Sequence, residues 1–153
     1  MNIINNIKIR FMISCAAILC FAGYASASES GIIKNIYGHV LIERGSSNFD
    51  AKVGDPVQEK DRISVKGYGS AGISMKDETL LSIGPNSSIV INTYVYNSVT
   101  REGQSATSVL KGSCRFVTGL IGRLNPKAVK VTTQSTTIGI RGTEFIVEVP
   151  DVE

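Results

Sequence analysis

Short runs in which apolar and polar residues alternate make up most of this chain. The clearest is Val129–Val149, where β-branched residues alternate with polar ones on both sides of Gly139 and Gly142. Alternation with a period of two is typical of strands. Turn-forming residues recur roughly every 8 to 12 positions, the spacing of an all-β protein. No window after Ala27 offers a convincing amphipathic helix, so the pattern predicts an all-β fold.

The expected strands are short and stack as antiparallel hairpins. A unit of strand, polar turn and strand recurs from Val57 to Ile91 with little change in length. Units this small cannot bury their own apolar face and must stack on neighbours. A twisted β-sandwich or a short irregular β-solenoid would satisfy this, and the lack of a sharp repeat favours the sandwich. The strands are expected at 31–44, 63–67, 71–75, 79–83, 89–96, 107–110, 113–117, 128–133 and 143–149.

The N-terminal residues have the order of a secretory signal peptide. Lys8 and Arg10 precede the apolar run Phe11–Ala22, and Ala25–Ala27 matches an A-x-A cleavage site. A retained membrane anchor is the alternative, but a spanning helix needs about 20 apolar residues. Lipid attachment at Cys20 is disfavoured by the bulky leucine before it. We therefore expect a helical signal peptide that is cleaved after Ala27.

Cleavage would leave residues 28–153 as a single exported all-β domain, periplasmic or secreted. Of the 16 basic residues, Lys8 and Arg10 leave with the leader, so 14 remain against 13 acidic ones and the net charge is +1. A near-neutral domain is not a nucleic-acid binder by default. The long apolar run leaves too, so no stable membrane insertion is expected. Only Cys114 remains, so a core and not an internal disulfide must stabilise the fold.

Few residues carry a pattern for chemistry. Gly67–Gly72 contains G-x-G-x-x-G, but a dinucleotide site needs a following helix, and a strand follows here. A turn with a bulge is favoured for this run, and a kink or bulge is expected at Gly38. His39 is the only histidine, and no G-x-S-x-G elbow occurs, so neither a zinc site nor a hydrolase triad is expected. Cys114 alternates with Phe116, as a buried residue does. We expect no catalytic residue, cofactor or metal.

Several acidic residues lie at predicted turns, at Asp55, Asp61, Asp77 and Glu78. Calcium binding is one interpretation, but no D-x-D-x-D-G run occurs. An aspartate at a turn favours hydrogen bonds to its own backbone neighbours. The turn interpretation is therefore preferred.

A block of basic residues lies between Gly103 and Thr143, which contains six of them and no acid. A block of one sign can attract an anionic partner, such as a polyanionic envelope polymer or an acidic protein face. Alternation divides strand residues between two faces, which favours simple solvation of these charges. The candidate anionic-partner patch consists of Lys111, Arg115, Arg123, Lys127 and Lys130.

The segment Thr137–Phe145, T-I-G-I-R-G-T-E-F, resembles the closing motif of FecR domains. Other segments resemble further landmarks of that domain, in order: Ile36–Gly45, Val53–Asp55, Asp61–Val65, Lys76–Ile83 and Arg115–Gly119. FecR regulators act on a sigma factor through a cytosolic segment and receive a signal through a periplasmic part. This chain resembles the periplasmic part alone, so the sigma-factor role is not carried over.

The resemblance implies one of two functions. The first is a non-catalytic, exported interaction module that contacts an envelope protein or a cell-wall polymer. The second is a soluble periplasmic component of a signalling pathway, which senses a partner and relays the signal to a separate membrane protein. A hydrolase is disfavoured, and the oligomeric state stays open.

The closing motif supplies the candidate structural residues Gly139, Arg141, Gly142, Thr143 and Phe145. Arg141 is permanently charged in an apolar stretch, so its guanidinium needs solvent or a partner. One hypothesis makes it a structural fork that donates to turn carbonyls or to the carboxylate of Asp55, Asp61 or Asp77. The other makes it an exposed anion-binding residue.

Overall fold

The computed structural model describes residues 28–140 and 142–150. The signal-peptide prediction for residues 1–27 and the Arg141 hypotheses fall outside the described residues. Of the described residues, 64% lie in strands, which confirms the all-β prediction. The elements are β1 (Glu29–Arg44), β2 (Ser47–Asp50), β3 (Pro56–Gln58), β4 (Arg62–Met75), β5 (Leu80–Ile83), β6 (Ser88–Tyr96), β7 (Gly103–Val117), α2 (Leu120–Leu124), η1 (Pro126–Ala128), β8 (Val129–Thr132), β9 (Thr137–Gly139) and β10 (Glu144–Val149).

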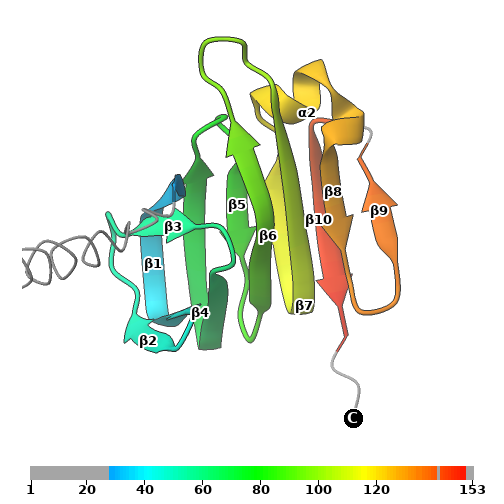
Figure 1. The fold of residues 1–153 in the computed structure, drawn as a ribbon. Helices are drawn as coiled ribbons and strands as arrows, with labels where there is room; N and C mark the ends of the chain where they lie inside the picture. Colours follow the sequence, from blue (N-terminus) through cyan, green and yellow to red (C-terminus); the bar gives the residue numbers. More distant parts are fainter. Residues whose placement is uncertain (1–27, 141, 151–153) are drawn as a thin grey trace, which may run out of the picture.

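All ten described strands belong to one connected sheet (Figure 1). Its main path runs β2-β1-β4-β5-β7-β8-β9, and β3, β6 and β10 pair beside this path. Because β6 pairs with both β4 and β7, the strands β4, β5, β7 and β6 close a ring. The sheet is therefore folded on itself.

Each of the three long strands bends at a glycine with positive φ. These are Gly38 in β1 (φ 74°), Gly67 in β4 (φ 57°) and Gly112 in β7 (φ 73°). Before its bend β4 pairs with β6, and after it with β5. Before its bend β7 pairs with β6 and β8, and after it with β5 and β10. The bends carry each strand from one half of the folded sheet to the other, so the all-β fold is one sheet with a barrel-like ring of strands.

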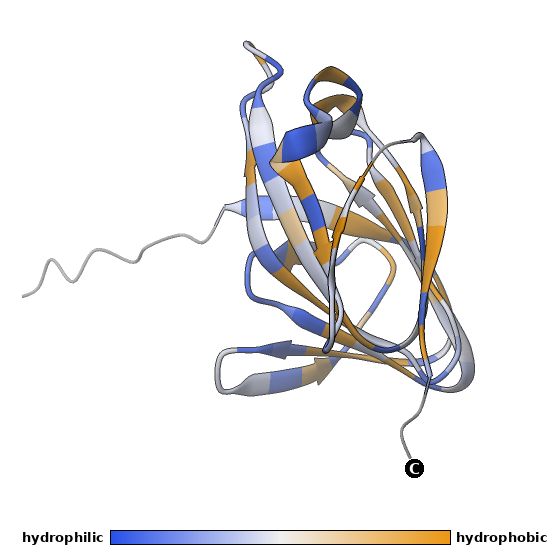
Figure 2. Cartoon of the chain, turned by 90° about the vertical axis from the view of Figure 1, so that its right-hand side faces the viewer, coloured by the Kyte–Doolittle hydropathy of each residue, from blue (hydrophilic) through white to orange (hydrophobic). Residues whose placement is uncertain are grey.

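The core lies between the two halves of the sheet. Apolar positions recur along the strands, drawn in orange in Figure 2. Cys114 is 1% exposed in this cluster, so its predicted burial is confirmed. The core gathers β-branched residues, which fit a pleated surface well. The largest fully buried side chains are Ile33, Ile42, Ile63, Ile73, Ile83, Ile89, Ile91, Ile121, Val40, Val57, Val65 and Val109.

The observed elements differ from the expected ones in continuity. Residues 63–67 and 71–75 form the single strand β4, and 107–110 and 113–117 form the single strand β7. A positive-φ glycine bends each strand without ending its pairing. The G-x-G-x-x-G run lies within β4, and the β1–β4 register shifts opposite it, so the bulge is confirmed while the predicted turn is part of a continuous strand.

Two short helical segments lie where no helix was predicted. The α2 helix has five residues and η1 has three, which is too short for a helical period to show in the sequence. They connect β7 to β8, and this crossover makes the β7–β8 pair parallel, whereas the other described pairs are antiparallel. Within residues 28–140 and 142–150, no helix has the length and apolar character needed to cross a membrane.

Candidate functional site

A buried carboxylate fixes the start of α2. Asp77 is 1% exposed, and its carbonyl oxygen accepts a hydrogen bond of 2.7 Å from the Leu120 amide. Its Oδ2 accepts from the Ile121 amide at 3.3 Å and from the Thr79 hydroxyl at 2.8 Å. The Tyr94 hydroxyl donates to Asp77 Oδ1 at 3.0 Å and accepts from the Asp77 amide at 2.8 Å. Burial raises the pKa of Tyr94, and the Asp77 charge adds to this. The turn between β4 and β5 thus holds the helix in place.

An open groove lies where α2 and η1 lead into β8. We call it the η1 groove, and it has a volume of about 760 Å³. The segment before β8 and the β8–β9 hairpin form its walls. Its lining residues are Asn125, Pro126, Lys127, Val129, Lys130, Thr137, Gly139 and Ile140. The lining of the groove combines apolar residues with two positively charged ones, Lys127 and Lys130.

The walls of the η1 groove follow from strand alternation. Val131 is fully buried, so its neighbour Lys130 points to the outer face of the sheet. In the β8–β9 register Lys130 lies opposite Gly139. A Cβ added at Gly139 would meet no atom within 4 Å, so the space beside Lys130 is open. Ile140 closes the apolar side of the groove at 8% exposure.

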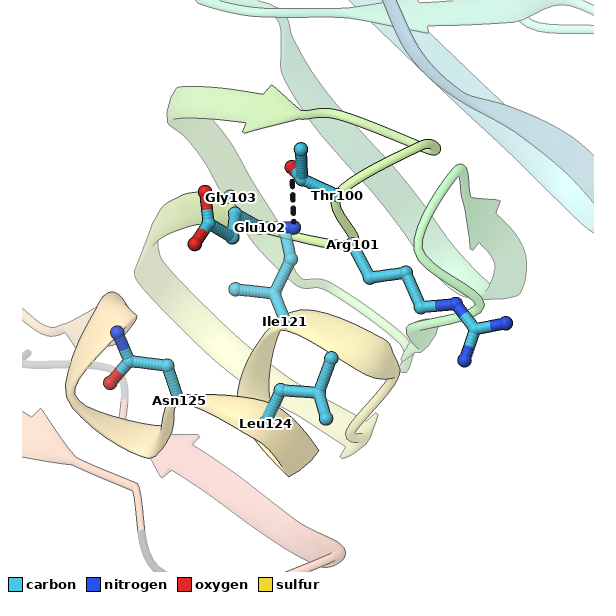
Figure 3. A pocket seen from close by; sticks show the side chains of 7 residues that line it. All are labelled: Thr100, Arg101, Glu102, Gly103, Ile121, Leu124 and Asn125. Carbon is cyan, nitrogen blue, oxygen red and sulfur yellow. Dashed lines mark hydrogen bonds between the residues drawn. The ribbon is translucent and has the colours of Figure 1, made fainter.

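A second hollow lies between the tip of the β6–β7 hairpin and α2, with a volume of about 370 Å³ (Figure 3). Ile121, Leu124 and Asn125 line it from the helical side, and Thr100–Gly103 from the hairpin. In Figure 3 the Arg101 side chain points away from Asn125. Asn125 lines both hollows, so they adjoin at the end of α2.

The structure brings together two of the predicted patch residues, Lys127 and Lys130, in the η1 groove. Arg115 lies beyond the bend of β7 and pairs with Glu144 of β10 at 2.7 Å. Arg123 donates to the Thr118 carbonyl at 3.0 Å. Lys111 lies on β7 opposite Ser88. The five residues therefore do not form one surface.

The closing motif contributes to both the groove and the core. Gly139 lines the η1 groove, while Phe145 stacks on Phe116 with ring centroids 4.9 Å apart. The Gly142 and Thr143 carbonyls accept hydrogen bonds from Thr118, at 3.3 Å from its hydroxyl and 2.7 Å from its amide. These contacts attach the start of β10 to the end of β7.

The carboxylates suggested as partners of Arg141 have other hydrogen-bond donors. Arg44 donates from Nε and Nη2 to the two oxygens of Asp61, each at 2.7 Å. Asp55 accepts from the Lys52 amide at 2.8 Å. The turn interpretation of these acids is confirmed, since Asp61 and Asp77 also accept from the amides of Gln58 and Thr79. The Arg141 fork stays a prediction.

Sequence reasoning missed Arg44 and Tyr94 as partners of buried carboxylates. Arg44 is at the end of an alternating strand, and nothing in its neighbourhood along the chain indicates Asp61.

His39 pairs with Asp50 at 2.6 Å, with both side chains more than half exposed. Among the described residues, no three histidine, cysteine, aspartate or glutamate side chains gather where they could hold a metal ion.

The fold and the site together define an all-β domain with a groove on its surface. The chain belongs to the FecR family, because the model of the family described as FecR protein matches residues 61–152, more than half of the chain. Proteins of this family take part in envelope signalling with partner proteins, and their FecR domains are periplasmic. No curated protein and no solved structure matches the chain. The matched segment contains the η1 groove and the closing motif.

Proposed function

We propose that this protein is a non-catalytic, exported FecR domain, residues 28–153, which binds a partner protein in the bacterial cell envelope through the η1 groove. The groove is the observation that carries the proposal. It presents apolar residues and two exposed lysines on a surface that the protein itself leaves open. Concave surfaces lined mainly by apolar residues, with a few polar or charged groups, are the usual binding sites of proteins.

The alternative is a periplasmic signalling component that senses a partner and relays the signal to a separate membrane protein. The family match favours it, since FecR proteins take part in envelope signalling. Both functions require a partner at the groove. They differ in the partner, because relay requires a membrane protein with a cytosolic part.

Site-specific crosslinking in living cells tests the proposal. A photoreactive amino acid replaces Thr137 in the groove. The control places it at Tyr68, which is 93% exposed at the bend of β4. We expect one crosslinked protein from position 137 and none from position 68. Failure to crosslink from position 137, or equal products from both, would refute the proposal. Mass spectrometry of the product identifies the partner. A membrane protein with a cytosolic part would favour the signalling component, and any other envelope protein would favour the interaction module.

Export is tested separately. The intact mass of the protein from the periplasmic fraction should correspond to a chain that begins at Ser28. A species that retains Met1–Ala27 in the membrane fraction would contradict cleavage.

A further inference from the structure

We propose that the η1 groove takes an extended peptide segment in which an aliphatic side chain is flanked by carboxylates. This inference rests on the proposed function, because it names the chemistry of the partner at the same groove. Three observations carry it: the charge of the groove, the missing side chain at Gly139 and the free edge of β9.

The charge of the groove is purely basic. Lys127 and Lys130 are its charged lining residues, and both are exposed. Within residues 28–140 and 142–150, neither lysine forms an ion pair. Two unpaired ammonium groups beside an apolar surface attract an anion and disfavour a cationic partner. Carboxylates of a partner would supply the missing charge.

The shape of the groove suits an aliphatic side chain next to those carboxylates. Gly139 leaves open the space opposite Lys130, so the lysine side chain can extend across β9 without obstruction. Val129, Pro126 and Ile140 supply the apolar part of the lining. A volume of about 760 Å³ lies within the range of ligand pockets, about 300–1,000 Å³.

The edge of β9 favours a peptide over a lipid. In the described part of the chain β9 pairs with β8 alone, so its outer edge offers backbone donors and acceptors (Figure 1). An extended peptide can pair with such an edge, and alternate side chains then reach the pockets beside it. An acyl chain has no groups for that pairing.

The test uses labelled peptides and the exported protein. The probe is Asp-Val-Asp-Leu-Asp-Val, and its control replaces each Asp by Lys. By fluorescence anisotropy we expect a Kd below about 1 mM for the acidic peptide and no measurable binding of the basic one. Lys127→Glu and Lys130→Glu should each weaken binding about tenfold. The double variant should instead bind the basic peptide.

Two further variants separate the groove from general charge. Lys34→Glu makes the same change on β1, towards the opposite end of the sheet, and should leave binding within about twofold. Gly139→Ile fills the open space, and its backbone conformation is not left-handed, so this variant should fold and lose binding. Circular dichroism checks that it folds.

Several outcomes would overturn the inference. They are no binding of the acidic peptide, an equal loss in Lys34→Glu, or unchanged binding in folded Gly139→Ile. Capture by phosphatidylglycerol vesicles that depends on Lys127 and Lys130, without peptide binding, would assign the groove to a membrane surface instead.

If the crosslink from position 137 persists in the double lysine variant, the proposed function stands and the acidic chemistry is wrong. If the parent gives no crosslink, the proposed function itself fails.

Discussion

Asp61 is fully buried, and Arg44 satisfies both of its carboxylate oxygens. The Arg44 side chain keeps 30% of its surface in solvent, so it can partly rehydrate when the pair is broken. We expect Asp61→Ala to lower the free energy of unfolding by about 3 kcal/mol, at the lower end for a broken buried pair. Urea unfolding measures this change.

The matched control is Asp50→Ala, which breaks the hydrogen bond between His39 and Asp50, whose side chain is 68% exposed. Exposed pairs contribute about 0–1 kcal/mol, so this variant should unfold almost like the parent. If the two variants lost the same free energy of unfolding, the buried Arg44–Asp61 pair would contribute no more to stability than an exposed pair.

The buried thiol of Cys114 should lower the free energy of unfolding at alkaline pH. Burial raises the pKa of its thiol from 9.0 to about 12. As the pH rises above 9, the unfolded thiol ionises before the folded one, so the unfolded state gains stability. The free energy of unfolding should fall by up to about 1.4 kcal/mol per pH unit.

The measurement is urea unfolding between about pH 8 and about pH 9.5, because Tyr94 adds a loss of the same sign as the pH approaches 10. Cys114→Ala should be less stable at every pH but should lack this slope. A parent slope equal to that of Cys114→Ala would contradict the assignment.

At the scale of the element, α2 depends on the hydroxyl of Tyr94 on another strand. This hydroxyl bonds both the amide and the carboxylate of Asp77, which in turn bonds the amides of Leu120 and Ile121. Tyr94→Phe leaves two buried polar groups short of a partner, which costs about 1–3 kcal/mol. Amide hydrogen exchange at Leu120 and Ile121 should accelerate in this variant.

Tyr96→Phe is the control for that experiment, because Tyr96 lies on the same strand and its hydroxyl makes no hydrogen bond within the described part of the chain. Exchange in α2 should stay as in the parent. If both variants behave alike, Asp77 alone positions the helix.

At the scale of the whole molecule, the fold depends on bends in its long strands. Gly112 has φ 73°, and an added Cβ would collide with Ser87. Gly112→Ala should therefore lose at least about 1–2 kcal/mol, the cost of a left-handed backbone for a residue with a Cβ. Gly139→Ala meets no atom within 4 Å and should melt like the parent. Thermal melts compare the two, and a normal melting temperature for Gly112→Ala would mean that the bend can move.

The candidate site could be predicted only in part. The sequence indicated a basic block and the closing motif, and Lys127, Lys130 and Gly139 from those sets do line the groove. It gave no sign that Arg115 would pair with Glu144 in the other half of the sheet. The reason is that the bend at Gly112 separates charges that lie close together along the chain.

The sequence by itself determined the all-β class, the approximate positions of the longer strands and the family, but not the short strands β2, β3 and β9. Alternation and turn chemistry act over a few residues, so they can be recognised without knowing the fold. Only the tertiary structure decided that glycine bends fold one sheet on itself, that β8 runs parallel to β7 and that Lys130 faces Gly139. Those features arise from pairing between distant segments, whose partners are selected by burial of a common core rather than by neighbours along the chain.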